Sequence, residues 1–456
     1  MNKRKLLSIT LIISMLTMNY VPSLAYASFL KKNVIQAQVN DYKFQNVNLD
    51  WWKSYNDEYL DEYIIKAINE NQDLKIATLK VEEARQNVKI QFSKELPSAS
   101  IGVAPLLLKN TGLTSSDGEF AVPMLVSYEA DIFLKNHDKT KSAQKTYEAS
   151  KFDEKAVYIS IASQVGATYF NIIKADKLIE LQEKIMKERK EIYELTKLSN
   201  SQGMASTADE VRAKKSYVLT VVDLTDLKKS REKLLTSLAV LIGESPNNIN
   251  ELKRVSYEEL PKCKQIPDEI PSEIITQRPD YMAAELNIQK AGIDVRVAKK
   301  EFLPKINILG LVAFLSTNAA SSLNWENAVA ILAGAAMLPL FTGGRNTANL
   351  RIKKNQYEQI LQSYYKTNLT AIQEVNDALS ALKLDNEKYE NNLDSYNMQK
   401  VDYHHSSNKY NQGIISKLDL LQEQETLLTI NKTVISSHTD CYINQISLYK
   451  AVGGKI

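Results

Sequence analysis

Cysteine is scarce in this chain of 456 residues, and long uncharged apolar stretches are scarce as well. The two cysteines, Cys263 and Cys441, form no recognisable disulfide framework or metal-binding spacing. Charged residues make up 24% of the sequence and the mean hydropathy is −0.30. This composition excludes a protein built from many membrane-spanning helices.

The N-terminal apolar run is too short for a membrane anchor. Three basic residues at 3–5 precede an apolar run from Leu6 to Met18, and small residues at 25 and 27 offer a cleavage site. A helical anchor needs ~20 apolar residues, so residues 1–27 are predicted to be a cleaved signal peptide. No cysteine stands just after the run, so no lipid is expected there.

The chain that remains after removal of the signal segment also lacks a net charge. The formal charge is +3, and the signal segment carries three positive and no negative residues, which leaves zero for the remainder. A neutral protein without a basic stripe is a poor match for nucleic acid.

Glycine and proline are nearly absent from two long segments. From Arg345 to Val452 there is no proline, and Gly413 is the one glycine. Stretches of ~60 residues without a breaker predict helices about 90 Å long. A heptad row in the last one is typical of supercoiled helices: it comprises Leu420, Leu427, Val434, Cys441 and Leu448. Cys441 is therefore predicted to be a buried core thiol, neither reactive nor metal-binding.

The chain contains two copies of one plan. Its landmarks recur at offsets of 207 to 210, as for Pro97 and Pro304 or Gly203 and Gly413. We expect structural repeats at 28–250 and 251–456, each with a helix, a strand pair and a long helical hairpin. The predicted bounds are strand pair 97–133 and hairpin 137–243 in the first, and helix 278–302, strand pair 305–341 and hairpin 345–452 in the second.

Each hairpin is predicted to turn at a glycine. Gly203 and Gly413 stand where a positive φ ends one helix. Ser206 and Ser416 can begin the next helix, and an aspartate follows each serine by three residues, Asp209 in the first turn and Asp419 in the second.

The strand segments alternate with period two, as Phe120, Val122, Met124, Val126 and Tyr128 do. Segments of ~9–13 such residues suit membrane-spanning strands, but a half-buried sheet of a soluble protein fits equally well. Four strands cannot close a membrane barrel, and an open edge is not tolerated in lipid. If these strands span a bilayer, several chains must share one barrel.

Six segments in order resemble the TolC-like outer membrane efflux proteins, above all the branch that serves tripartite drug and metal efflux pumps. They are WWKSYNDEYLDEYIIKAINENQDLKIA (51–77), VSYEADIF (126–133), QRPDYMAAELNIQKAGIDVRVAKKEFLPKINI (277–308), PLFTGGR (339–345), NLTAIQEVNDAL (368–379) and YNQGIISKLDLLQEQETLL (410–428). The resemblance implies a mainly α fold with a small β part. Three chains would share a twelve-stranded barrel in the outer membrane, and their hairpins would form a tunnel through the periplasm. It also implies a passive duct with no reaction and no cofactor, served by a periplasmic adaptor protein and an inner-membrane transporter.

The resemblance also implies a pore constriction. In TolC-like proteins, acidic residues six and nine positions after the second turn glycine ring the closed entrance; here these are Asp419 and Gln422, so one acid is kept. Three Asp419 carboxylates near one axis would attract cations, and one ring should hold a divalent ion more weakly than two. The alternative is that Asp419 only stabilises the first turn of its helix.

Two other classes of protein compete with the channel. A periplasmic coiled-coil tether or adaptor would explain the hairpins and the signal peptide, but not the two strand pairs. For an enzyme, the sequence offers no nucleophile–base set, phosphate loop or Cys/His cluster. His404 and His405 are neighbours, and neighbours on a helix point ~100° apart, so they do not share a metal face.

Overall fold

The computed structural model describes residues 51–102, 104–106, 119–247, 252–261, 272–316 and 328–454. The chain divides into two units, 1–48 and 49–456, and the second is described here by itself. The predicted signal peptide lies outside the described residues, as does Cys263.

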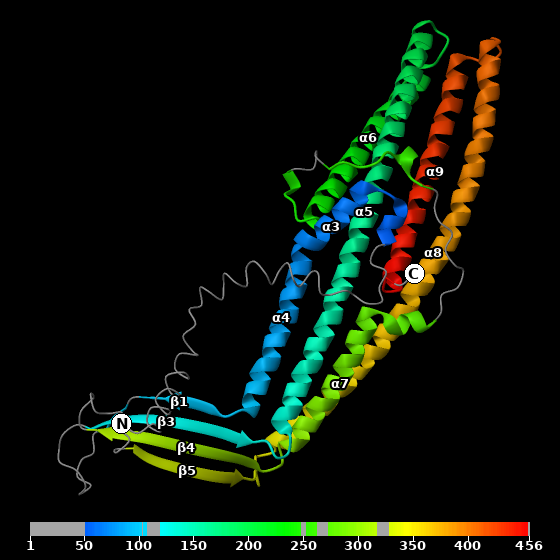
Figure 1. Ribbon diagram of the computed structural model, residues 1–456. Coiled ribbons are helices and arrows are strands. Elements are labelled where there is room, and N and C mark those ends of the chain that lie inside the picture. Colours follow the sequence, from blue (N-terminus) through cyan, green and yellow to red (C-terminus); the bar gives the residue numbers. More distant parts are fainter. Residues whose placement is uncertain are drawn as a thin grey trace. The chain divides into compact units, whose positions relative to one another are not determined.

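Four long helices make up most of this unit, and their lengths match in pairs (Figure 1). Helices α5 (Lys135–Ser201) and α8 (Arg345–Asn411) have 67 residues each, and α6 (Thr207–Leu241) and α9 (Lys417–Ala451) have 35 each. At 1.5 Å per residue, the longer pair spans about 100 Å. Both predicted hairpins are therefore present, with the first long helix starting two residues earlier than expected.

Shorter helices accompany the hairpins. Helix α4 (Gln72–Phe92) packs on α5, and α7 (Pro279–Lys300) packs on α5 and α8. Helix α5 also packs on α6 and α9, and α9 on α8, so the four long helices run in the order α6, α5, α9, α8 (Figure 1). The remaining helical elements are α3 (Glu58–Glu70), η1 (Trp51–Tyr55), η2 (Ser93–Glu95), η4 (Tyr257–Glu259) and η5 (Ser272–Gln277).

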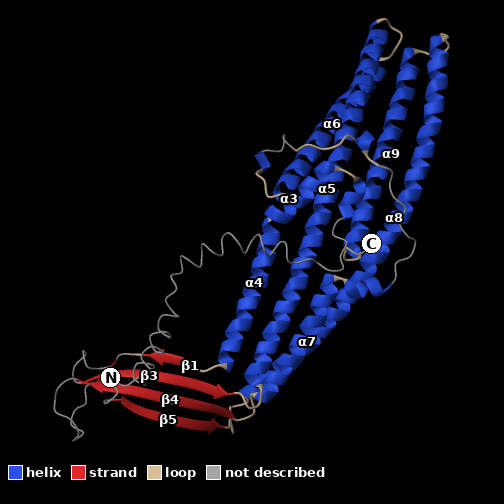
Figure 2. Ribbon diagram, viewed as in Figure 1, coloured by secondary structure: helices blue, strands red, loops and turns tan. Residues whose placement is uncertain are grey.

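One antiparallel sheet stands at the end of the unit opposite the hairpin turns (Figure 2). Its strands are β1 (Ser98–Ile101), β2 (Ala104–Leu106), β3 (Glu119–Ala130), β4 (Lys305–Ser316) and β5 (Ala328–Met337). The order is β1-β3-β4-β5, and β2 also pairs with β3, so the described sheet has four strand positions. Strands β3 and β5 end three and four residues before the predicted limits of 133 and 341.

Proline accounts for the break between β1 and β2. Both keep the same register against β3, in which Ile101 faces Met124 and Ala104 faces Ala121. Pro123 stands opposite Gly102 and has no N–H to donate, while the Gly102 N–H donates to the Pro123 carbonyl over 2.9 Å.

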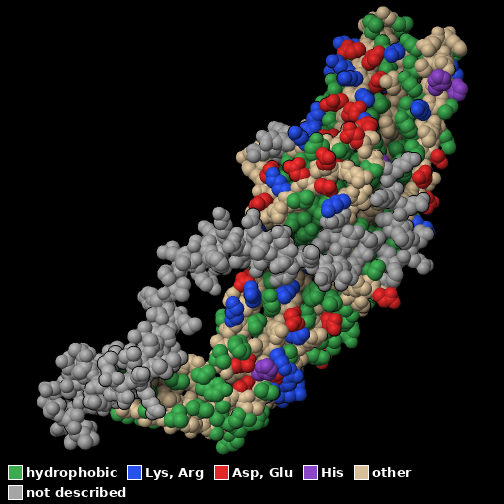
Figure 3. All heavy atoms as spheres, in the orientation of Figure 1, with side chains coloured by type: hydrophobic (Ala, Val, Ile, Leu, Met, Phe, Trp, Pro, Cys, Tyr) green, Lys and Arg blue, Asp and Glu red, His purple; other side chains and the backbone are tan. Residues whose placement is uncertain are grey.

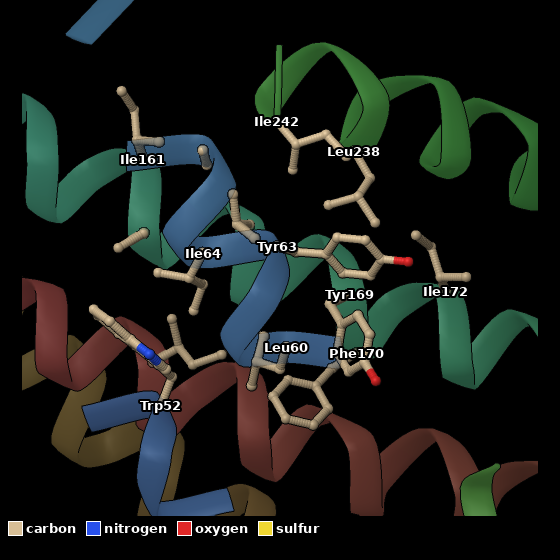
Figure 4. Close-up of a cluster of buried hydrophobic side chains, with 14 of the residues drawn as sticks. Trp52, Leu60, Tyr63, Ile64, Ile161, Tyr169, Phe170, Ile172, Leu238 and Ile242 are labelled. Carbon is tan, nitrogen blue, oxygen red and sulfur yellow. The ribbon is translucent and has the colours of Figure 1, made fainter. Parts of the chain in front are cut away.

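The core is aromatic and lies midway along the helices, where α3, α5, α6 and α9 meet (Figure 4). Phe170 stacks on Tyr442 with ring centroids 5.0 Å apart, and Tyr55 meets both rings edge-on. Tyr169 donates to Asp57 over 2.6 Å. Helix α5 is the described helix whose length and composition would allow a membrane span, and 56% of its most apolar stretch is buried.

Cys441 corrects one prediction. The residue is 1% exposed, in accord with a core position, but it is disulfide-bonded, so the expectation of a free thiol is wrong. The other cysteine of the sequence, Cys263, is outside the described residues. A heptad row predicts which face of a helix is buried, but it carries no information about the covalent bonds of a cysteine on that face.

Candidate functional site

The two hairpin turns have the same backbone. Gly203 has φ 75° and Gly413 has φ 74°, the left-handed conformation that glycine adopts without steric cost. The Met204 N–H donates to the Ser199 carbonyl over 2.8 Å, and the Ile414 N–H donates to the Lys409 carbonyl over 2.9 Å. These bonds satisfy carbonyls at the helix end, so both predicted turns form at the expected glycines.

Each returning helix begins with a capping box. The Asp209 N–H donates to Ser206 Oγ over 3.2 Å, and the Ser206 N–H donates back to Asp209 Oδ2 over 3.3 Å. In the second turn the Asp419 N–H donates to Ser416 Oγ over 3.2 Å, and the Ser416 N–H donates to Asp419 Oδ2 over 3.0 Å. Asp419 thus has the helix-stabilising contacts that the alternative reading expects.

The two aspartates differ in their next neighbour. Arg212 lies 3.4 Å from Asp209 Oδ1, and the equivalent residue of the second turn, 210 positions later, is the neutral Gln422. Hydrogen bonds from Ser206, first, and then the charge of Arg212 lower the pKa of Asp209. The first turn therefore carries a paired carboxylate, and the second has no cation at the corresponding position.

Packing behind the aspartates differs as well. Leu420 and Leu421 are 7% and 1% exposed, whereas Val211, which corresponds to Leu421, is 60% exposed. Asp419 and Gln422 are themselves exposed and three residues apart, which places them on one face of α9. Because Leu420 and Leu421 are buried, the side of α9 that carries Asp419 and Gln422 points away from the packed interior.

Polar side chains join the two hairpins near the turns. Gln424 on α9 donates to Glu188 on α5 over 2.7 Å and accepts from Tyr403 on α8 over 3.3 Å. Farther toward the turn, Lys417 lies 3.7 Å from Glu191. Burial, and then the nearby charge of Glu191, raise the pKa of Glu188. These links were not predicted, because heptad spacing identifies apolar seams and gives no cross-helix partners for polar residues.

Two edges of the unit carry exposed apolar side chains. The outer helices present seams with heptad spacing, which are Val211, Val218 and Val222 on α6 and Leu384, Met398 and Val401 on α8; each is 49% to 67% exposed. The sheet ends in β1 and β2 on one side and β5 on the other. Among described residues, no group of three or more His, Cys, Asp or Glu could hold a metal ion.

Known proteins share this fold. A family model described as "Outer membrane efflux protein" matches residues 63–244 and 270–454, one segment in each half of the chain. A relative in Pseudomonas putida, "Toluene efflux pump outer membrane protein TtgC", is 26% identical over 412 residues, covering 89% of this chain and 84% of that protein. "Cation efflux system protein CusC" of Escherichia coli is 24% identical over 408 residues, covering 89% of each.

Solved structures of other outer membrane proteins have the same fold. The CmeC outer membrane channel of Campylobacter jejuni superposes with a TM-score of 0.81 at 25% identity, covering 90% of this chain and 89% of that one. The outer membrane protein VceC of Vibrio cholerae has a TM-score of 0.77 at 18% identity, covering 90% and 99%, which is a likeness of fold. The predicted fold class and outer membrane location are confirmed. The chain belongs to the outer membrane efflux protein family.

Proposed function

We propose that three copies of this chain form one passive duct that carries cargo from an inner-membrane pump across the periplasm and the outer membrane. A periplasmic adaptor protein would join pump and duct at the hairpin turns. The chain would perform no reaction, because its part in transport is to enclose a path and the pump supplies the energy.

The open sheet is the observation that carries this proposal. Strand β5 is exposed at every residue after the first and contains no charged residue, and β1 at the opposite edge is exposed too. Unpaired strand edges cannot face lipid, because each unsatisfied N–H or C=O costs several kcal/mol there. Pairing β5 of one copy with β1 and β2 of the next removes every edge once the ring closes, and three copies give twelve strands.

The helices support the same ring. Helices α6 and α8 are the outer members of the four-helix row, and their exposed seams match those of a coiled coil. If α8 of one copy packs on α6 of the next, the contact is heterologous and closes into a ring around an axis. The same contact buries apolar residues that one chain leaves in water.

The duct entrance is proposed to lie at the turns. Asp419 from three copies would form an acidic ring there, with Gln422 beside it, while Asp209 and Gly203 of the first turn would lie outside the constriction. The second turn has the neutral Gln422 where the first turn has Arg212, and it has the buried Leu420 and Leu421 next to Asp419. Both differences support this division between the turns.

A tether without a pore, the alternative weighed from the sequence, would require the sheet to be paired or buried by other means. The experiment is sedimentation in mild detergent together with far-UV circular dichroism. Trimers with full β content are expected. A monomer that retains its β content would contradict the proposed duct.

A matched pair of methionines tests the helical contact. Met398→Glu on the α8 seam should dissociate the trimer, because it places three charges in an apolar contact. Met204→Glu is the control, because Met204 is 72% exposed at a turn and Met398 is 67% exposed on the seam. Equal dissociation by both variants, or by neither, would contradict the proposed contact.

A further inference from the structure

The register of the sheet assigns each side chain to one of two faces. Directly paired residues lie on the same face, and neighbours along a strand alternate. One face, called here the outer face, holds Ala99, Ile101, Val122, Met124, Val126, Tyr128, Ile306, Ile308, Val312, Phe314 and Leu332. It contains no charged residue among the described strands.

The opposite face, called the inner face, begins polar. At the end next to the helices it holds Lys305, Glu129 and Asn307, followed by Ser127 and Ser98. A membrane strand keeps its apolar side toward lipid and its polar side toward the lumen. The outer face therefore meets lipid, and the inner face lines the lumen of the shared barrel.

Farther from the helices the next rows of the inner face are mostly apolar. Ser100, Leu125, Leu311 and Ile331 lie side by side across the four strand positions, and Leu309 lies beside Ser127 in the adjacent row. Leu125, Leu309 and Ile331 are 38%, 43% and 54% exposed. These four residues, Leu125, Leu309, Leu311 and Ile331, are called here the inner girdle. Hydrophobic side chains also predominate on the visible part of the sheet, whereas charged side chains are interspersed with other types over the helices (Figure 3).

A water-filled lumen does not need such residues. Strands with one wet face normally alternate apolar and polar side chains, and here both faces are apolar at the level of Leu311. Exposed apolar surface of this kind marks a contact with an apolar partner. In a closed barrel the inner girdle faces the lumen instead of lipid, and the partner that its chemistry fits there is an apolar solute.

We propose that the inner girdle is a contact surface for apolar or amphiphilic organic cargo. This inference rests on the proposed function, since the girdle lines a lumen only in the closed barrel. Four apolar side chains from each of three copies line this level of the lumen, with Ser100 of each copy in the same row. An apolar solute that passes it buries surface against leucine and isoleucine and is held weakly, while small hydrated ions gain nothing from the same wall. The duct thereby favours the organic class of cargo over metal ions.

The probe is tetraphenylphosphonium, with tetramethylammonium as the polar cation of equal charge. Purified trimers are inserted in planar bilayers, and the reversal potential in a salt gradient is recorded as each cation is added. Bound tetraphenylphosphonium makes the lumen positive and shifts selectivity toward anions. We expect this shift in the wild-type channel with tetraphenylphosphonium and not with tetramethylammonium, after subtraction of the protein-free bilayer response.

Matched truncations on the two faces locate the effect. Leu309→Ala with Leu311→Ala shortens the girdle, and Ile308→Ala with Val312→Ala makes a comparable change on the outer face of the same strand. The girdle variant should raise the half-maximal tetraphenylphosphonium concentration by about threefold or more. The outer-face variant should behave as wild type. Heat-resistant trimers in both samples exclude misfolding as the cause.

The outcomes distinguish a failure of the proposed function from a failure of the inner girdle as a cargo surface. If the wild-type protein forms no trimeric pores, the proposed function fails. If pores form and tetraphenylphosphonium acts no differently from tetramethylammonium, or both double variants behave as wild type, the inner girdle is not a cargo surface. A loss confined to the Ile308 and Val312 variant would reverse the two faces and would also overturn the proposal.

Discussion

The middle of the molecule and the far ends of its hairpins are built from the same helices but hold together differently. In the middle, Tyr169, Phe170 and Tyr442 are fully buried, with rings in contact. Toward the turns, α6 has no buried residue before Thr220 and α8 has none after Leu382. The core is buried within one chain, whereas the hairpin ends leave exposed apolar surfaces that the proposed trimer would cover.

The largest expected effect is in the core. Phe170→Ala removes a ring that touches Tyr55, Tyr169 and Tyr442, and should cost ~3–5 kcal/mol of unfolding free energy. Tyr193→Ala is the matched change in a hairpin, where its ring stacks on Tyr217 at 6.4 Å and is only partly buried. It should cost about 1 kcal/mol. Denaturant unfolding followed by circular dichroism measures both, and equal losses would contradict the contrast.

Glycines with the same backbone make a second test. Gly243 and Gly413 have φ 75° and 74°, but a Cβ on Gly243 would lie 2.7 Å from the Glu70 carbonyl oxygen, whereas one on Gly413 meets nothing within 4 Å. Gly413→Ala should cost ~1–2 kcal/mol for the left-handed backbone alone. Gly243→Ala adds a clash with α3 and should cost ~1–3 kcal/mol more. Thermal unfolding of both variants measures the difference, which would vanish if α3 could simply move away.

Acid should weaken the core before it affects the hairpins. The Nδ1 atom of His438 lies 2.9 Å from the Tyr257 hydroxyl, its Nε2 atom lies 3.1 Å from the Tyr442 hydroxyl, and the ring stacks on Tyr389. Burial lowers the pKa of His438. The folded state therefore binds fewer protons than the unfolded state, whose histidine has a pKa of ~6.5. The stability that neutral His438 contributes is complete above pH ~6.5. It declines as the pH falls below that value, by at most ~1.4 kcal/mol per pH unit.

Unfolding midpoints at pH 7.5 and 5.5 measure this effect. His438→Gln should reduce the difference between the two midpoints. His404→Gln on the exposed end of α8 should leave it as in the wild type. A pH dependence that is unchanged in His438→Gln would show that another group controls the acid response.

Sequence alone predicts what repeats locally. The absence of breakers predicts two hairpins whose ends agree with the structure within a few residues, and Gly413 with Ser416 predicts the turn and the cap. Contacts between distant segments are not encoded in such spacing. Gln424 gives no sign in the sequence that it joins Glu188 to Tyr403. The disulfide at Cys441 was missed for the same reason, because a helical row describes one element and not its partner.

The two turns can also be compared with each other. A substitution of Asp419 should change stability less than the variants above, but it should change ion selectivity most. Asp419→Asn keeps an acceptor for the Ser416 N–H and should cost at most ~1 kcal/mol of stability. If Asp419 lines the constriction, the substitution should lower cation selectivity about twofold or more in planar bilayers and weaken block by divalent cations. Asp209→Asn should change neither property. Unchanged selectivity and block in Asp419→Asn would leave this residue as a helix cap only.

A charge swap separates the position of a carboxylate from its pairing. Gln422→Arg gives Asp419 the partner that Asp209 already has in Arg212, so it should reduce cation selectivity although the carboxylate remains. Arg212→Gln makes the reverse change in the first turn. If only the second turn faces the axis, Arg212→Gln leaves selectivity unchanged, because an unpaired Asp209 outside the constriction is screened by solvent within about 10 Å. If Arg212→Gln raises cation selectivity as much as Gln422→Arg lowers it, both turns line the entrance, and pairing alone distinguishes them.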